Sequence, residues 1–164
     1  MKMRKSKLFW KLGVSPKQIS CVPFSDNEEY YSFLRNQYNA GYRQVIVSSE
    51  AMIEIIKDAV IKDKYSVYSI EFAEDDEELQ EEINGILTAV ENNPACIVIL
   101  LEKLQFLAEK SSIDIQRVKI KGRKSSGGAV DFYIQSNGLI GINEEAYDEI
   151  LQKESTLIER CLFG

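Results

Sequence analysis

The sequence predicts an α/β domain with a Rossmann-like three-layer core, in which a mostly parallel sheet lies between helices. Two β-branched and aromatic runs, Arg43 to Ser48 and Tyr65 to Phe72, flank an amphipathic run from Glu50 to Lys62. A strand, a helix and a second strand in this order are typical of a parallel crossover unit. The chain has 164 residues, 45% of them hydrophobic, which is enough for one domain with a sizeable core.

The first 18 residues form a basic N-terminal segment, and we expect the α/β domain to span residues 19–164. Leu8, Trp10 and Leu12 alternate along this segment, but Phe9 interrupts the alternation, so neither a helix nor a strand is favoured. We therefore expect a frayed tail whose Trp10 packs on the domain.

The same segment has an alternative interpretation as a contact surface. Arg4, Lys7 and Lys11 lie close to Trp10 in the sequence, and basic residues beside an aromatic ring suit an anionic membrane surface or partner. The apolar run from Leu8 to Trp10 is too short for a signal peptide. No run in the chain approaches the ~18 apolar residues of a membrane-spanning helix.

Strand and helix boundaries follow from capping residues. Ile19 to Phe24 is predicted as a strand, and Ser25 with Glu28 forms a capping box that starts a helix over residues 26–39. Ser48 or Ser49 caps the helix over residues 50–62. The acidic run over residues 74–82 opens a third helix, which ends at residues 92–94, Asn-Asn-Pro.

The run from Ala95 to Lys110 allows two interpretations. Cys96 to Leu101 is rich in β-branched residues and follows a proline, which favours a fourth buried strand and then a short helix. One continuous helix through Leu100, Leu104 and Leu107 fits the spacing of apolar residues equally well.

From Ile113 onward the pattern changes to short strands joined by turns. Strands are predicted at residues 114–121, 130–135 and 139–142, and Ser136-Asn137-Gly138 between the last two is a strong hairpin sequence. We expect an antiparallel meander that extends the parallel sheet. A final helix is predicted over residues 144–161, capped by Asn143.

Charge is unevenly distributed along the chain. The net charge is −6, yet residues 1–17 and 117–124 together hold eleven of the 20 basic residues and none of the 26 acidic ones. The rest of the chain carries nine bases against 26 acids, a net charge of −17. Two basic regions on an acidic body attract oppositely charged partners.

The second basic region is a candidate binding element for an anionic partner. Arg117, Lys119 and Lys121 alternate along a predicted strand, so they share one face, and Arg123 with Lys124 extends the row toward a glycine-rich loop. Such a basic hairpin arm can contact phosphates of a nucleic acid. Because no aromatic residue lies at its tip, it would distinguish sequences poorly.

No catalytic set is recognisable. The chain has no histidine, which removes the commonest general base, the triads that use it and most zinc sites. The three cysteines have no metal-binding or redox spacing, and they suit a reducing cytoplasm. The loop at residues 121–128 lacks the residue order of a phosphate-binding loop.

These observations predict a small cytoplasmic regulatory or adaptor protein that is non-catalytic and has no cofactor and no metal site. We expect a monomer or homodimer whose acidic body binds a basic protein partner. The alternative is weak nucleic-acid binding, with little sequence preference, through the basic hairpin arm. A metal-dependent carboxylate enzyme that uses the acids of residues 74–82 is a further alternative.

Overall fold

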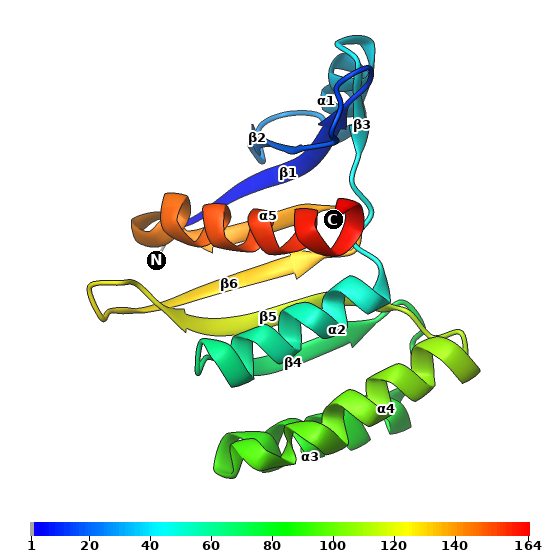
Figure 1. Ribbon diagram of the computed structural model, residues 1–164, viewed down its shortest axis with the longest axis vertical. Helices are drawn as coiled ribbons and strands as arrows, with labels where there is room; N and C mark the ends of the chain where they lie inside the picture. Colours follow the sequence, from blue (N-terminus) through cyan, green and yellow to red (C-terminus); the bar gives the residue numbers. More distant parts are fainter. Residues whose placement is uncertain (1) are drawn as a thin grey trace.

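The computed structural model describes residues 2–164 and shows a seven-stranded, mostly antiparallel sheet with helices packed mainly on one face (Figure 1). The strands are β1 (Met3–Lys11), β2 (Ile19–Phe24), β3 (Tyr42–Gln44), β4 (Ser66–Phe72), β5 (Ile115–Arg123), β6 (Ala129–Gln135) and β7 (Leu139–Asn143). The helices are α1 (Tyr30–Asn39), α2 (Ser49–Lys57), α3 (Glu77–Asn92), α4 (Ile97–Lys110) and α5 (Tyr147–Phe163). A π-helical turn, Asp58–Lys62, extends α2, and 3-10 turns at Pro94–Cys96 and Glu144–Ala146 precede α4 and α5.

The predicted mostly parallel, Rossmann-like sheet is wrong. The strand order is β2-β1-β7-β6-β5-β4 with β3 also paired to β1, and the strand pairs run antiparallel. The two strands that flank α2 are not neighbours, because β3 pairs with β1 whereas β4 forms an edge next to β5. The strand, helix and strand that suggested a parallel crossover therefore connect distant parts of the sheet.

The N-terminal segment forms β1, so the expectation of a frayed tail is wrong for Met3–Lys11. β1 pairs with β2 along one side and with β7 and β3 along the other. Leu8 faces the helices, whereas the ring of Phe9 lies 5.9 Å from that of Phe33 in α1, and both Leu8 and Phe9 are buried. A strand that is covered on both faces lacks apolar and polar alternation, which is why Phe9 interrupted the pattern.

The predicted fourth strand is also wrong, because residues 97–110 form the helix α4. The side-chain oxygen of Asn93 accepts a hydrogen bond from the backbone N–H of Ala95 at 3.2 Å, and Pro94 occupies the first position of the turn that leads into α4. A capping residue followed by proline starts a helix. The Asn-Pro pair thus ends α3 and begins the next helical segment.

The other helices begin only partly where the sequence predicted. Ser48 caps α2 as predicted, and its hydroxyl accepts a hydrogen bond from the backbone N–H of Ala51 at 3.2 Å. The first helix begins later than expected, because the carboxylate of Glu29, rather than Ser25, accepts the N–H groups that start α1.

The predicted hairpin at Ser136-Asn137-Gly138 is confirmed between β6 and β7. The backbone N–H of Gly138 donates to the carbonyl of Gln135 at 3.0 Å, and Gly138 has a φ of 85°. A Cβ at Gly138 would lie 2.5 Å from the carbonyl oxygen of Val45. Glycine is required there because of its positive φ and because the backbone at Val45 approaches so closely.

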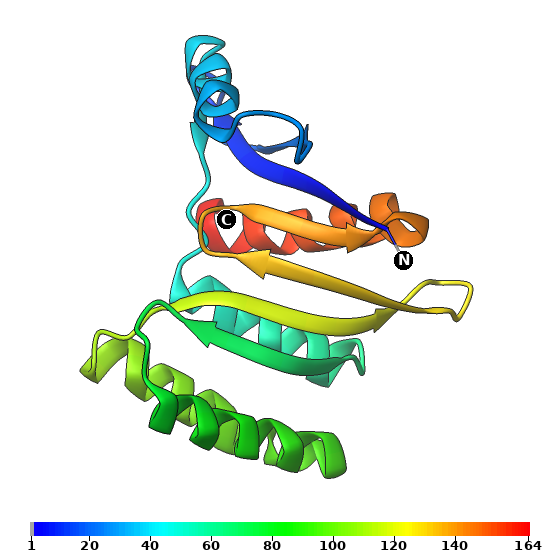
Figure 2. The same ribbon diagram turned by 180° about the vertical axis from the view of Figure 1, so that it is seen from behind.

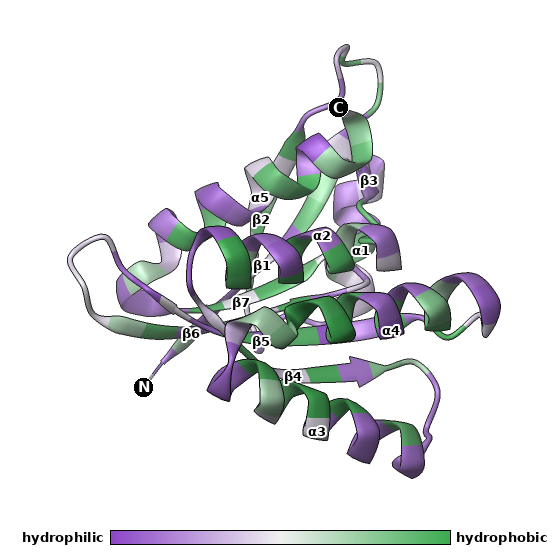
Figure 3. Ribbon diagram, turned by 60° about the horizontal axis from the view of Figure 1, so that its bottom comes forward, coloured by the Kyte–Doolittle hydropathy of each residue, from purple (hydrophilic) through white to green (hydrophobic). Residues whose placement is uncertain are grey.

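The helices leave one face of the sheet uncovered. α2 and α5 pack on one face with α4 beside α2, whereas α1 lies on the other face, near β1, β2 and β3 (Figures 1 and 2). Figure 3 shows hydrophobic and hydrophilic residues alternating along the helices, as expected for helices with one buried side. Seen from behind, the strands β4 to β7 have no helix in front of them (Figure 2).

The edge strand β4 is protected by α3. The side-chain amide of Gln80 donates to the backbone carbonyl of Ile70 at 3.0 Å, which satisfies a hydrogen-bonding group that an edge strand would otherwise expose. Within residues 2–164, no helix has both the length and the apolar character needed to cross a membrane.

Candidate functional site

The predicted cation row lies on the uncovered face of the sheet. Val118 and Ile120 of β5 are fully buried beneath the helices. Arg117, Lys119 and Lys121 alternate with them along the strand and are partly or fully exposed. Because successive side chains of a strand point to opposite faces, the three cations form a line down the middle of the uncovered surface.

This row is not a protruding arm, because β5 pairs with β4 on one side and β6 on the other. The two outer cations that were grouped with it are engaged elsewhere. The guanidinium of Arg123 donates to the carbonyl of Lys64 at 3.3 Å, and the ammonium of Lys124 lies 3.2 Å from the carboxylate of Glu145. The cation row is therefore Arg117, Lys119 and Lys121.

The four candidate contact residues of the N-terminal segment divide between the two faces of β1. On the helical side, the guanidinium of Arg4 lies 4.1 Å from the ring centroid of Tyr147, and Trp10 packs against the core. On the other side, Lys7 is completely buried and Lys11 is exposed at the strand end. The fold does not gather these four residues into one exposed surface.

Lys7 is a structural lysine inside the domain. Its ammonium donates to the backbone carbonyl of Asn137 and lies 5.8 Å from the ring centroid of Tyr30. Burial lowers the pKa of Lys7 to about 8, because a buried site disfavours the charged form.

Two tyrosines that the sequence analysis did not single out flank the cation row. Tyr68 of β4 is 45% exposed, and the ammonium of Lys121 lies 5.7 Å from its ring centroid. Tyr133 of β6 is directly opposite Lys119 in the strand register. The guanidinium of Arg117 lies 5.3 Å from the ring centroid of Tyr133. Aromatic and cationic side chains therefore share this surface.

The ring of Tyr133 lies across Gly141 of β7. A Cβ at Gly141 would stand 2.3–2.7 Å from three carbons of that ring, so the face of the ring rests against the strand. A glycine inside a strand often marks such a close approach. The alternation in β6, where Phe132 and Ile134 are buried and Tyr133 is not, is the sequence feature that could have identified this tyrosine.

A hollow of about 420 Å³ lies on the uncovered face. Its lining residues come from five strands: Met3, Tyr68, Arg117, Lys119, Asp131, Tyr133 and Asn143. We call it the sheet-face hollow.

Asp131 is the acidic residue of the sheet-face hollow. Its Oδ1 is buried and has no hydrogen-bond partner within the described protein. Its backbone N–H donates to the side-chain oxygen of Asn143 at 2.6 Å. Asn143 thus supports β6 and makes no side-chain cap for the following helix, contrary to the prediction.

The cation row is only partly neutralised within the protein. A carboxylate oxygen of Glu71 lies 3.7 Å from Arg117 and 3.8 Å from Lys119. These ion pairs are long and between a third and two-fifths exposed, so each contributes little to stability. The guanidinium of Arg117 also donates to the side-chain oxygen of Gln135 at 2.5 Å, so Lys119 and Lys121 are the cations most available to an anionic ligand.

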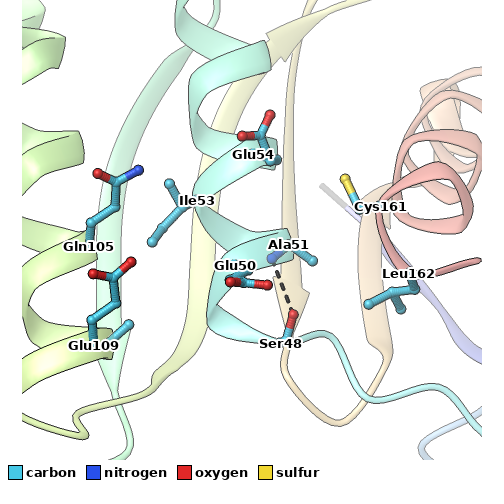
Figure 4. Close-up of a pocket in the computed structure, with 10 residues that line it drawn as sticks. Ser48, Glu50, Ala51, Ile53, Glu54, Gln105, Glu109, Cys161 and Leu162 are labelled. Atoms are coloured by element: carbon cyan, nitrogen blue, oxygen red, sulfur yellow. Dashed lines mark hydrogen bonds between the residues drawn. The ribbon is translucent and has the colours of Figure 1, made fainter. Parts of the chain in front are cut away.

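A second hollow, of about 510 Å³, lies on the helical side between α2, α4 and α5 (Figure 4). Glu50 and Glu54 of α2 and Glu109 of α4 line it, with Ile53 contributing apolar surface. Cys161 of α5 is also in the lining, and burial together with the charge of Glu54 raises the pKa of its thiol. A raised pKa makes this cysteine a poor nucleophile at neutral pH.

The acidic run that was considered as a metal site forms the start of α3. Asp76 caps this helix, and its carboxylate accepts a hydrogen bond from the backbone N–H of Leu79 at 3.0 Å. Within residues 2–164, no three acidic or cysteine side chains are grouped so that they could hold a metal ion.

The chain was compared with known proteins, and no protein-family model, no curated protein and no solved structure matches it.

Proposed function

We propose that this protein is a non-catalytic binding protein that engages an anionic macromolecule through the uncovered face of its sheet. The observation that carries the proposal is the row of Arg117, Lys119 and Lys121 with Tyr68 and Tyr133 on its two sides. An antiparallel sheet often leaves one face in water, so exposure alone supports nothing. The support comes from the concentration of cations and aromatic rings there.

The group of cations on the uncovered face differs in sign from the net charge of the protein. The chain has a net charge of −6, so the protein as a whole repels a polyanion. A local basic surface on an acidic body orients the approach of such a partner and favours one bound geometry.

Retention on immobilised heparin tests the proposal. Lys119→Ala with Lys121→Ala removes two cations from the uncovered face, and Lys57→Ala with Lys110→Ala removes two exposed cations from α2 and α4. Both variants have the same net charge. We expect the first variant to elute at clearly lower salt than the wild type and the second to elute with the wild type. Equal elution of the two variants would overturn the proposal.

The hollow on the helical side supports a second candidate function, which is binding of a basic segment of a protein partner. Glu50, Glu54 and Glu109 surround apolar surface, an arrangement that suits the charged end and the aliphatic stem of an arginine or lysine. We expect an arginine-rich peptide to bind the wild type and to lose affinity when these three residues become Gln. Glutamines at Glu77, Glu78 and Glu81 of α3 provide the control of equal charge, and equal losses would count against this site.

A further inference from the structure

We infer that the ligand of the uncovered sheet face is a single-stranded nucleic acid, whose bases stack on Tyr133 and Tyr68 while its phosphates contact Arg117, Lys119 and Lys121. This inference rests on the proposed function and names the ligand class of that same surface. Stacking on aromatic rings beside a basic track is the general way in which proteins hold single strands.

The two rings have a suitable arrangement across the sheet. Tyr68 belongs to β4 and Tyr133 to β6, and β5 with its cations runs between them. Neighbouring strands are about 4.8 Å apart, so the two tyrosines stand roughly 10 Å from each other across β5. A short run of nucleotides can place one base on each ring and keep its backbone over the cations.

Tyr133 is preorganised for stacking. One face of its ring rests against Gly141, where a Cβ would stand only 2.3 Å from the nearest ring carbon. The ring is half-buried, and the guanidinium of Arg117 lies 5.3 Å from its centroid. Because its position is already restricted by packing, little side-chain entropy is lost when a base stacks on it.

The shape of the surface argues against a duplex. The bases of a duplex are stacked on one another and are reached through its grooves by a helix or a protruding ribbon. The cation row lies on a strand in the interior of the sheet, between β4 and β6. Unpaired bases, in contrast, can lie directly on the sheet.

The carboxylates of this surface argue against an acidic peptide. The sheet-face hollow contains Asp131, whose Oδ1 has no hydrogen-bond partner within the described protein, and Glu71 lies beside the cation row. These groups repel the carboxylates of an acidic peptide. They can instead accept hydrogen bonds from the amino groups of nucleobases, as Asp and Glu do with cytosine.

Fluorescence anisotropy with a labelled single strand of about ten nucleotides tests the inference. We expect the single strand to bind at least about tenfold more tightly than its duplex or the free mononucleotide. Tyr133→Leu and Tyr68→Leu should each weaken binding by roughly tenfold, whereas Tyr133→Phe keeps the ring and most of the affinity. Phe106→Leu is the control, because Phe106 is an exposed aromatic residue on α4.

Several outcomes separate this inference from the proposed function. If Lys119→Ala with Lys121→Ala weakens binding but the leucine variants do not, the polyanion surface stands and the stacking inference is overturned. Equal affinity for the duplex, for polyglutamate or for the free mononucleotide also overturns the inference.

Should a leucine variant unfold, a single strand carrying 4-thiouridine is crosslinked to the wild-type protein. Crosslinks at β4 and β6 support the inference, and crosslinks confined to the helices contradict it.

Discussion

The two faces of the sheet differ in cover, in charge and in aromatic content. One face is covered by α2 and α5, and the hollow between its helices is lined by Glu50, Glu54 and Glu109. The other face, over β4 to β7, has no helix in front of it (Figure 2). It carries the cation row and the two tyrosines. A net charge of −6 describes neither of them, because strand alternation places the cations of β5 on one side and its apolar residues on the other.

Each side of the sheet also buries a residue whose side chain can carry a charge. Lys7 of β1 is completely buried on the side of α1. Glu154 of α5 is 2% exposed, and its Oε2 has no hydrogen-bond partner within the described protein. Burial lowers the pKa of Lys7 and raises the pKa of Glu154, each to about 8. The two groups therefore give the unfolding free energy opposite dependences on pH.

The largest effect is expected from Glu154→Gln. Between its ordinary pKa of 4.5 and about 8, the unfolded chain has released this proton and the folded chain retains it. The contribution of Glu154 is therefore fully present below pH 4.5 and is lost as the pH rises to about 8. Relative to the wild type, the glutamine variant should gain on the order of 2–4 kcal/mol between about pH 5 and pH 8.

Urea unfolding at both pH values measures this gain. Asp148→Asn, an exposed acid on the same helix, serves as the control and should show no such change. A gain for Glu154→Gln that does not vary with pH would contradict the assignment of a proton to the buried carboxyl group.

The next largest effect is expected from reversing charge on one face at a time. Lys119→Glu with Lys121→Glu should reduce single-strand affinity by about a hundredfold, because two attractions become repulsions beside the phosphates. Lys57→Glu with Lys110→Glu has the same net charge and should change the affinity less than about threefold. Anisotropy at low salt measures both, and similar losses would mean that overall charge rather than one face controls binding.

Lys7→Met should have a smaller effect on stability, with the opposite pH dependence. The pKa of Lys7 falls from 10.5 to about 8 on folding, so its contribution to stability is present above pH 10.5 and is lost as the pH falls through about 8. The methionine variant should be more stable than the wild type near neutral pH, and this advantage should shrink toward about pH 10. Thermal unfolding at both pH values checks the prediction, which a constant advantage would contradict.

The smallest effect is expected at Asp131. If the carboxylate of Asp131 accepts a hydrogen bond from a base amino group, oligocytidylate should bind several-fold more tightly than oligothymidylate. Asp131→Asn should reduce that preference, because the amide is a weaker acceptor than the carboxylate. Competition between the two oligonucleotides measures the preference. Equal binding of both by the wild type would remove Asp131 from the base-contacting residues.

The C-terminal half of the uncovered face was the most predictable part of the molecule. β5, β6 and β7 are joined by short turns, so alternation and the Asn137-Gly138 turn were enough to predict the three strands. The same turn fixes the register that puts Tyr133 opposite Gly141. The position of this tyrosine was therefore implied by residues next to it in the chain.

The rest of the fold depends on contacts between distant residues. β1 pairs with β7 through Met3 and Asn143, at opposite ends of the chain, and no local pattern indicates such a pairing. β1 itself was obscured because Leu8 and Phe9 are both buried, one on each side. Alternation showed that the cations of β5 share a face, but only the tertiary structure shows that no helix covers it.

Lysine footprinting shows which face of the sheet the nucleic acid covers, since each face of this protein carries its own lysines. Reductive methylation with and without the single strand, read by mass spectrometry, reports on Lys119 and Lys121 of β5 and on Lys57 and Lys110 of the helices in one sample. We predict that the nucleic acid protects Lys119 and Lys121 and leaves Lys57 and Lys110 as reactive as before. Protection of the helical lysines, or equal protection of all four, would contradict it.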